Sequence, residues 1–358
     1  MLDLQSLTQN IQHNCHISDA QFAGNYTMCI FLLKMRGYYR WEKGIPLSQP
    51  LPRSEIGDWL TAREEYWDSL HESSLSPVTL NNQTFDPFDS QSINEILNPH
   101  GYVYSGGYGI YHKPYFFLGR LEKKEVRDGI TLLVSSEEYA RDLVAPPAML
   151  LNETVFIRKE SLRNLIWERI DEWRIKKNKD TPMARALACY NFESRQDRHM
   201  ETILNEITDN ELGVVLLHET GEAQARSLLG SQWEDLLNAL PRSNAEFITR
   251  AVRDNLADCL TTLPTLIETE NAASLHFYFA NFNGMRRELF PEALEAYQYW
   301  LDSGSLSALS DVCQNGRRHW EDIAGKILSL YHNHANSLAK DIESLANEET
   351  NKECPVHI

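Results

Sequence analysis

Apolar residues recur every three or four positions from about residue 159 onward, which is the spacing of amphipathic α-helices. Glycine, proline, serine and asparagine separate the successive segments. We therefore expect an all-α helical bundle over residues 151–348, followed by a flexible tail at 349–358. The individual helices are expected over 160–178, 183–207, 209–239, 244–262, 271–290, 291–302 and 306–347.

The N-terminal part of the chain shows a mixed pattern. Residues 18–21 have the spacing of a capping box and open a run rich in Phe, Met, Leu and Tyr, so we expect a helix over 18–41. A second helix is expected over 54–71, after a proline-rich stretch. Between about 101 and 135, glycines divide aromatic and β-branched runs, which predicts a small antiparallel β-meander. The expected fold is mostly α, and α+β overall, with an N-terminal α+β domain over 1–150 ahead of the helical bundle.

The length and charge of the chain narrow its class. At 358 residues it exceeds one ordinary core, so we expect two domains or one domain with a large extension. The formal net charge of −17 repels phosphate backbones and anionic lipids, so we expect neither nucleic acid nor a membrane surface as a partner. No apolar run approaches the roughly 20 residues that span a bilayer, and the N-terminus lacks the features of a signal peptide.

The spacing of the cysteines indicates the cellular compartment, and the absence of a phosphate-loop motif bears on nucleotide cofactors. No Cys-x-x-Cys pair occurs, which favours reduced thiols in a cytoplasmic protein. The glycine-rich segment "YSGGYG" lacks the Gly-Lys-Ser/Thr of a phosphate loop, so no nucleotide cofactor is indicated. The six cysteines are Cys15, Cys29, Cys189, Cys259, Cys313 and Cys354.

Several predicted helices carry a carboxylate or an imidazole on an otherwise apolar stripe. In "GVVLLHETGEAQARSLLG", His218 and Glu222 share such a stripe, with Cβ atoms about 5–6 Å apart. A buried carboxylate must be paired, protonated or bound to a metal. The candidate metal ligands on four successive helices are Glu193, His218, Glu222 and His276, with Asp197 and Asp258 as second choices.

This collection resembles the ligands of ferritin-like and haem-oxygenase-like di-metal proteins, in which acids and imidazoles project inward from facing helices. The resemblance covers the C-terminal half and implies an iron or manganese centre. It also implies a metal-dependent oxidoreductase that activates O₂ or a related oxidant for an unidentified small-molecule substrate. Ferritin-like sites repeat Glu-x-x-His on two helices, whereas this chain has one His-x-x-x-Glu and one Glu-x-x-x-Asp, so the number of metal ions stays open.

A first alternative is that arginines neutralise the acids. The chain would then be a non-enzymatic interaction or scaffold protein whose bundle contains structural ion pairs, with His218 joining one helix to another. The arginines available for such pairs are Arg195, Arg198, Arg226, Arg250, Arg253 and Arg286.

A second alternative places the chemistry near the N-terminus. In "HNCHISDA", His13, Cys15 and His16 precede the helix expected from residue 18. A helix N-terminus lowers a thiol pKa, so Cys15 is a candidate nucleophile with His16 as its base. This hypothesis predicts a thiol-based enzyme.

Two segments resemble a known family. "CHISDAQFAGNYTMCIFLLKMRGYYRWEKG" and, far downstream, "FYFANFNGMRRELFP" are similar to a family of uncharacterised bacterial proteins. The resemblance spans most of the chain and implies a bacterial, cytosolic origin. It carries no activity, so it assigns no functional residue. It also leaves the oligomeric state open, so the chain could form a homo-oligomer.

Overall fold

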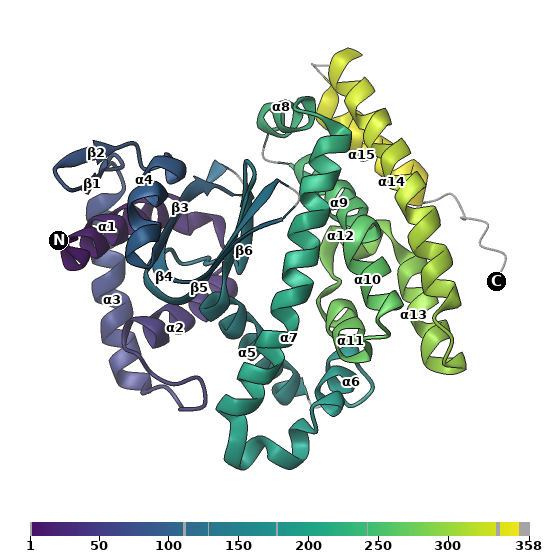
Figure 1. The fold of residues 1–358 in the computed structure, drawn as a ribbon, viewed down its shortest axis with the longest axis horizontal. Coiled ribbons are helices and arrows are strands. Elements are labelled where there is room, and N and C mark those ends of the chain that lie inside the picture. Colours follow the sequence, from purple (N-terminus) through teal and green to yellow (C-terminus); the bar gives the residue numbers. More distant parts are fainter. Residues whose placement is uncertain are drawn as a thin grey trace. The chain divides into compact units, whose positions relative to one another are not determined.

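The computed structural model describes residues 2–109, 112–127, 129–176, 178–241, 243–333 and 337–350, and only the backbone of 53, 194–199, 349 and 350. The chain divides into two units (Figure 1). Unit 1 consists of residues 1–168 and 199–208, and unit 2 of residues 169–198 and 209–358. Residues 351–358 of the expected tail lie outside the described residues.

The helices of unit 1 begin earlier than the pattern predicts. Asp3 caps the first helix by accepting a hydrogen bond from the Ser6 backbone N–H at 3.1 Å. The helix expected over 18–41 is therefore two helices, and Ser18 lies inside the first, where its hydroxyl donates to the Pro114 carbonyl. A 3₁₀ turn at Ala23–Asn25 separates them. The helices of this unit are α1 (Leu4–Phe22), α2 (Met28–Glu42), α3 (Arg53–Leu70), α4 (Ser90–Leu97) and the first part of α5 (Lys159–Lys176).

Unit 1 also contains a five-stranded sheet in the order β3-β4-β5-β7-β6, and a separate two-stranded pair. In this sheet, β3, β4 and β5 form the expected antiparallel meander. The last strand of this sheet along the chain, β7, pairs parallel to β5, with Leu132 opposite Val155. The strands are β1 (Val78–Leu80), β2 (Gln83–Phe85), β3 (Tyr102–Tyr108), β4 (Pro114–Arg127), β5 (Ile130–Arg141), β6 (Ala148–Leu151) and β7 (Thr154–Arg158).

One face of α1 packs on this sheet. Leu7, Ile11 and Cys15 recur at helical spacing and enter the same apolar cluster as Tyr104 of β3 and Phe116 of β4. Each of these five side chains is at most 2% exposed. The periodicity of the helix and the alternation of the strands therefore bury one shared core.

Next to this core lies a buried charge cluster that we call the Lys113 network. The Lys113 ammonium is 2.9 Å from Asp19 and 3.1 Å from Asp142, and Arg158 is 2.6 Å from Glu138. All five side chains are at most 8% exposed. Such a network must remain complete, because removing one partner leaves an uncompensated charge at a cost of about 3–5 kcal/mol.

Unit 2 is all-helical, as the sequence predicts for the C-terminal region. Helices expected separately at 183–207 and 209–239 are replaced by α6, a single long α7 and α8. The boundary near 208 contains no proline, and Gly213 alone costs about 1 kcal/mol, which a long helix tolerates. The helices are α6 (Pro182–Cys189), α7 (Phe192–Leu229), α8 (Gln232–Ala239), α9 (Asn244–Ala257), the π-helical η4 (Asp258–Thr262), α10 (Leu263–Glu268), α11 (Ala272–Asn281), α12 (Gly284–Leu289), α13 (Pro291–Ser303), α14 (Ser307–Asn333) and α15 (Leu338–Thr350).

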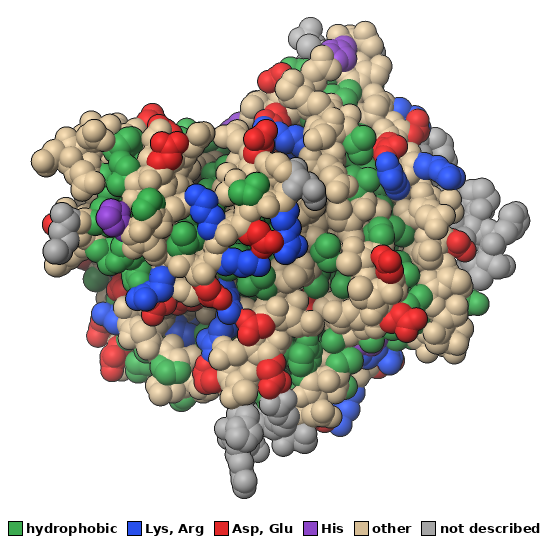
Figure 2. All heavy atoms as spheres, viewed as in Figure 1, with side chains coloured by type: hydrophobic (Ala, Val, Ile, Leu, Met, Phe, Trp, Pro, Cys, Tyr) green, Lys and Arg blue, Asp and Glu red, His purple; other side chains and the backbone are tan. Residues whose placement is uncertain are grey.

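The core of unit 2 is rich in aromatic side chains. Phe290 packs edge-on against Trp320, with ring centroids 5.4 Å apart, and both belong to one large apolar cluster. Among the described residues, no helix has the length and apolar character required to cross a bilayer. On the face that Figure 2 displays, acidic and basic side chains are interspersed.

Glu211 on α7 is an acid buried in unit 2, with 6% of its surface exposed. One of its oxygens accepts hydrogen bonds from Ser274 at 2.8 Å and Asn210 at 3.2 Å. Burial raises the pKa of this carboxyl from 4.5 to about 7. The folded protein therefore holds the Glu211 proton at pH values where the unfolded chain has released it.

This shift predicts a pH dependence of stability. Between about pH 4.5 and 7 the folded state binds more protons than the unfolded state, so the free energy of unfolding falls as the pH rises. Glu211→Gln removes this contribution, worth at most about 3 kcal/mol. Urea unfolding across this window should show a shallower decline for Glu211→Gln. Equal slopes for the wild type and Glu211→Gln would contradict the prediction.

Candidate functional site

The α7 and α9 helices of unit 2 approach each other closely at Gly221. A Cβ atom added there would lie 2.3 Å from the Ala257 carbonyl oxygen and 2.5 Å from the Thr261 hydroxyl. Thr261 also donates a hydrogen bond across the helices to the Leu217 carbonyl at 2.6 Å. The two backbones are therefore near enough for short acidic side chains to reach from one helix to the other.

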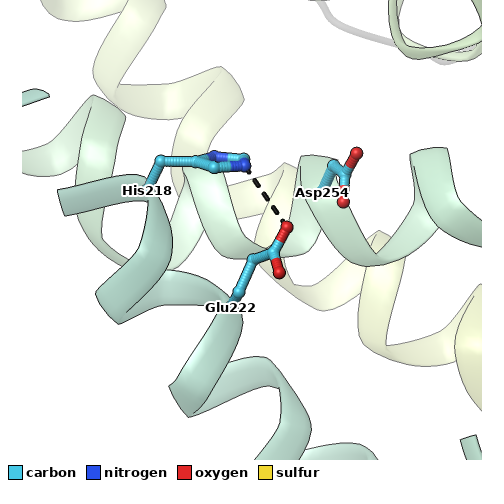
Figure 3. Close-up of side chains that lie close together, drawn as sticks. All are labelled: His218, Glu222 and Asp254. Carbon is cyan, nitrogen blue, oxygen red and sulfur yellow. Dashed lines mark ion pairs between the residues drawn. The ribbon is translucent and has the colours of Figure 1, made fainter. Parts of the chain in front are cut away.

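His218 on α7 has a carboxylate at each ring nitrogen. Its Nδ1 lies 2.8 Å from Oδ1 of Asp258, at the start of η4, and its Nε2 lies 3.4 Å from Oε1 of Glu222 (Figure 3). Burial opposes a charged imidazole, but the two carboxylates outweigh it and raise the pKa of His218 well above its usual value. The charged imidazole therefore donates from Nδ1 to Asp258 and from Nε2 toward Glu222, and only loss of the Nε2 proton would free a lone pair on the Glu222 side.

His218, Glu222 and Asp254 form a group that could hold a metal ion; we call it the His218 group. One ligand atom from each lies within 4.8 Å of the others (Figure 3). Ligands at about 2.0–2.2 Å from one ion are at most about 4.4 Å apart, so a small adjustment brings these atoms into range. One imidazole nitrogen and two carboxylate oxygens suit a divalent transition metal.

Arginines from neighbouring elements neutralise the same acids. Nη2 of Arg253 on α9 is 2.9 Å from Oε1 of Glu222 and 3.1 Å from Oδ1 of Asp254. Arg286 on α12 pairs with Asp258, whose Oδ2 also accepts a hydrogen bond from the Tyr278 hydroxyl at 2.9 Å. Two of the six arginines named from the sequence thus hold the acids of this cluster.

Glu219 follows His218 on α7 and is buried, with 7% of its surface exposed. Its Oε2 atom accepts no hydrogen bond from the described residues. Burial, and next the charge of Glu222, raise its pKa from 4.5 to about 8. His218, Arg253 and Asp254 also act on its pKa, and with a pKa of about 8 this carboxyl keeps its proton at neutral pH.

The structure brings together three of the six predicted ligands. His218, Glu222 and Asp258 meet at the α7–α9 contact, although Asp258 occupies the far side of the imidazole. Asp254 is an additional member; the signal that could have found it is its spacing of one helical turn before Asp258, which repeats the spacing of His218 and Glu222.

Glu193 and His276 do not join the group. Glu193 is exposed at the start of α7, about 25 residues before His218 and therefore about 37 Å away along the continuous helix. Because 183–207 and 209–239 are not separate helices, Glu193 cannot face His218 across a bundle. The side chain of Asp197 lies outside the described residues.

His276 on α11 belongs to an aromatic cluster. Its Nδ1 is 2.9 Å from the Tyr297 hydroxyl, and its ring stacks on Trp300 with centroids 4.8 Å apart. Burial, followed by the charge of Arg185, lowers the pKa of His276 to about 4. Its described contacts include no member of the His218 group.

The Cys15 environment differs from the one that the N-terminal hypothesis requires. Because α1 begins at Leu4, Cys15 lies inside the helix, where its thiol is fully buried and donates to the Phe116 carbonyl at 3.3 Å. Burial raises the pKa of this thiol well above its usual value. His16 faces Trp67, whose indole N–H donates to its Nδ1 at 3.2 Å, and burial lowers the His16 pKa to about 3.

The fold and site define a chain with an α+β N-terminal part and an all-helical C-terminal part that carries the His218 group. Residues 6–158 match the N-terminal domain, and residues 163–349 the C-terminal domain, of a family of unknown function (DUF6866). The chain belongs to this family, which confirms the resemblance to an uncharacterised family. The first match ends at the last residue of β7, and the second begins four residues into α5. Comparison with curated proteins and with solved structures gives no match.

The close contact at Gly221 makes a stability prediction. Gly221→Ala forces α7 away from Ala257 and should lower the free energy of unfolding by about 1–3 kcal/mol, as overpacking does. Gly213→Ala on the same helix has no atom within 4 Å of its new methyl group and should raise stability by about 0.5–1 kcal/mol. Thermal unfolding of both variants checks this, and a stabilised Gly221→Ala would show that the helices are not in close contact.

Proposed function

We propose that this protein binds one divalent transition metal at His218, Glu222 and Asp254, and that it is a metal-dependent oxidoreductase. The observation that carries the proposal is the orientation of His218. Its Nδ1 is held by the Asp258 carboxylate at 2.8 Å while its Nε2 faces Glu222. A carboxylate on the outer nitrogen of a metal-binding histidine fixes the ring and increases its basicity.

The ligand chemistry supports iron or manganese. Hard carboxylate oxygens with one imidazole nitrogen suit Mn²⁺ and Fe²⁺, and three protein ligands leave coordination positions for an oxidant and a small-molecule substrate. Oε2 of Glu219, on the same helix, is buried without a hydrogen-bond partner among the described residues, which is compatible with the proposal. Three donor atoms support one metal ion in place of the di-metal centre that the sequence resemblance implies.

We also propose a cytoplasmic location. The described cysteines are all free, including the exposed Cys29 and Cys189. Exposed free thiols fit a reducing compartment, in which Fe²⁺ and Mn²⁺ also keep their divalent state.

Metal binding by purified, tag-free protein tests the proposal. We expect about one Mn²⁺ or Fe²⁺ per chain after anaerobic loading, since three donor atoms surround one ion. Glu222→Gln should abolish binding, and Asp258→Asn should weaken it about 10- to 100-fold through loss of the imidazole orientation. Elemental analysis and equilibrium titration measure both effects.

Glu246→Gln is the matched control, because Glu246 lies on α9 but pairs with Arg250 outside the His218 group. It should bind metal like the wild type. Metal content far below one ion per chain in the loaded wild type, or equal affinity of Glu222→Gln and the wild type, would refute the metal site.

A second candidate function is a non-enzymatic interaction or scaffold role with structural ion pairs. The observation that favours it is that Arg253 and Arg286 already hold Glu222, Asp254 and Asp258. In that case the cluster serves to join α7, α9 and α12. Loss of one partner would then lower stability without removing any ligand.

Thermal unfolding with and without Mn²⁺ separates the two functions. A ligand that binds only the folded state raises its melting temperature, by an amount that depends on concentration. We expect Mn²⁺ to raise the melting temperature of the wild type and to leave that of Glu222→Gln unchanged. Identical shifts of both proteins, or none, would favour the scaffold function.

A further inference from the structure

Arg253 occupies the oxygen atoms that a metal at the His218 group needs. A single nitrogen, Nη2, contacts both Oε1 of Glu222 and Oδ1 of Asp254. A guanidinium keeps its proton at any accessible pH, so a metal that binds these oxygens competes with Arg253 for them, and we expect metal binding to move the Arg253 side chain away. About a fifth of that side chain is exposed, at 22%, which gives it a route toward solvent.

The displaced arginine would lack a partner. Its Nε–H is already buried and donates no hydrogen bond to a described residue. With a metal bound to neutral His218, the carboxylates of Glu222 and Asp254 would balance the charge of the metal. Asp258 would stay paired with Arg286. Glu219 makes no described ion pair with Arg253, although it lies nearby. A guanidinium left without a counter-charge at the rim of this partly buried site is unfavourable, and an anion beside it removes that cost.

We infer that the metal-loaded site takes a small oxyanion, with one oxygen on the metal and another on the Arg253 guanidinium. The substrate or co-substrate would therefore carry a carboxylate or a phosphate group. Arginine binds both groups through two parallel hydrogen bonds, and the open metal positions accept an oxygen ligand. This inference rests on the metal site proposed above and specifies the chemical class of its ligand.

Mn²⁺ titration of the full chain, followed by the electron paramagnetic resonance signal of free Mn²⁺, tests the inference. Separate titrations contain chloride, acetate or inorganic phosphate at equal ionic strength. We expect acetate or phosphate to increase the Mn²⁺ affinity of the wild type about fivefold or more relative to chloride. The anion that does so distinguishes a carboxylate from a phosphate ligand.

Arg253→Met removes the guanidinium and is the decisive variant. It should bind Mn²⁺ in chloride at least as tightly as the wild type, because the competing cation is gone, and it should show no oxyanion effect. Arg253→Lys keeps the charge and should retain part of the effect. Arg250→Met, one turn earlier on α9, should behave like the wild type, and circular dichroism verifies the fold of each variant.

The other outcomes are distinguishable. An equal oxyanion effect in the wild type and Arg253→Met, or none in the wild type while Mn²⁺ binds, would overturn this inference and leave the metal site intact. If the effect appears only after Glu219→Gln, then Glu219 is the internal counter-charge and the native site takes no oxyanion. Absence of Mn²⁺ binding in both the wild type and Arg253→Met would overturn the metal site itself.

Discussion

The α7 and α9 backbones meet where Gly221 faces Ala257, at a separation that leaves no room for a Cβ atom on α7. The contacts of the His218 group depend on this approach, because His218 and Glu222 extend from α7, Asp254 extends from α9, and Asp258, which contacts the imidazole, extends from η4. An aspartate side chain is short and reaches a neighbouring helix only at close range. The absence of a side chain at one position of α7 thus determines which charges meet across the two helices.

Burial of these acids creates competition between two kinds of cation. Arg253 satisfies the charge of Glu222 and Asp254, and a divalent metal would satisfy the same oxygens. A network of acids and arginines needs no histidine. Here, however, His218 contacts Asp258 through Nδ1 and Glu222 through Nε2. The Lys113 network of unit 1 illustrates the difference, since it neutralises buried acids with lysine and arginine alone. The ion pairs around His218 neutralise its acids in the described structure, and a metal at this place, as we propose, would replace part of that neutralisation.

The sequence pattern predicts the fold class well and the connections between elements poorly. Helical periodicity after residue 159 and the aromatic runs of the meander correspond to real elements, because both reflect burial of one face. The parallel pairing of β7 with β5 and the continuity of α7 are not visible in the pattern. Strand direction leaves no trace in alternation, and a polar stretch near 208 that contains no proline does not interrupt a helix.

For the candidate site, the sequence by itself determined that His218 and Glu222 share one face of one helix, since four residues make about one turn. It also identified Asp258 as an acid near an apolar face. Only the tertiary structure decided that Asp254 joins the group, that Asp258 holds the imidazole from behind, and that Glu193 lies far away. The physical reason is that spacing defines neighbours within a helix, whereas partners between helices depend on which residue is small enough to let two backbones approach.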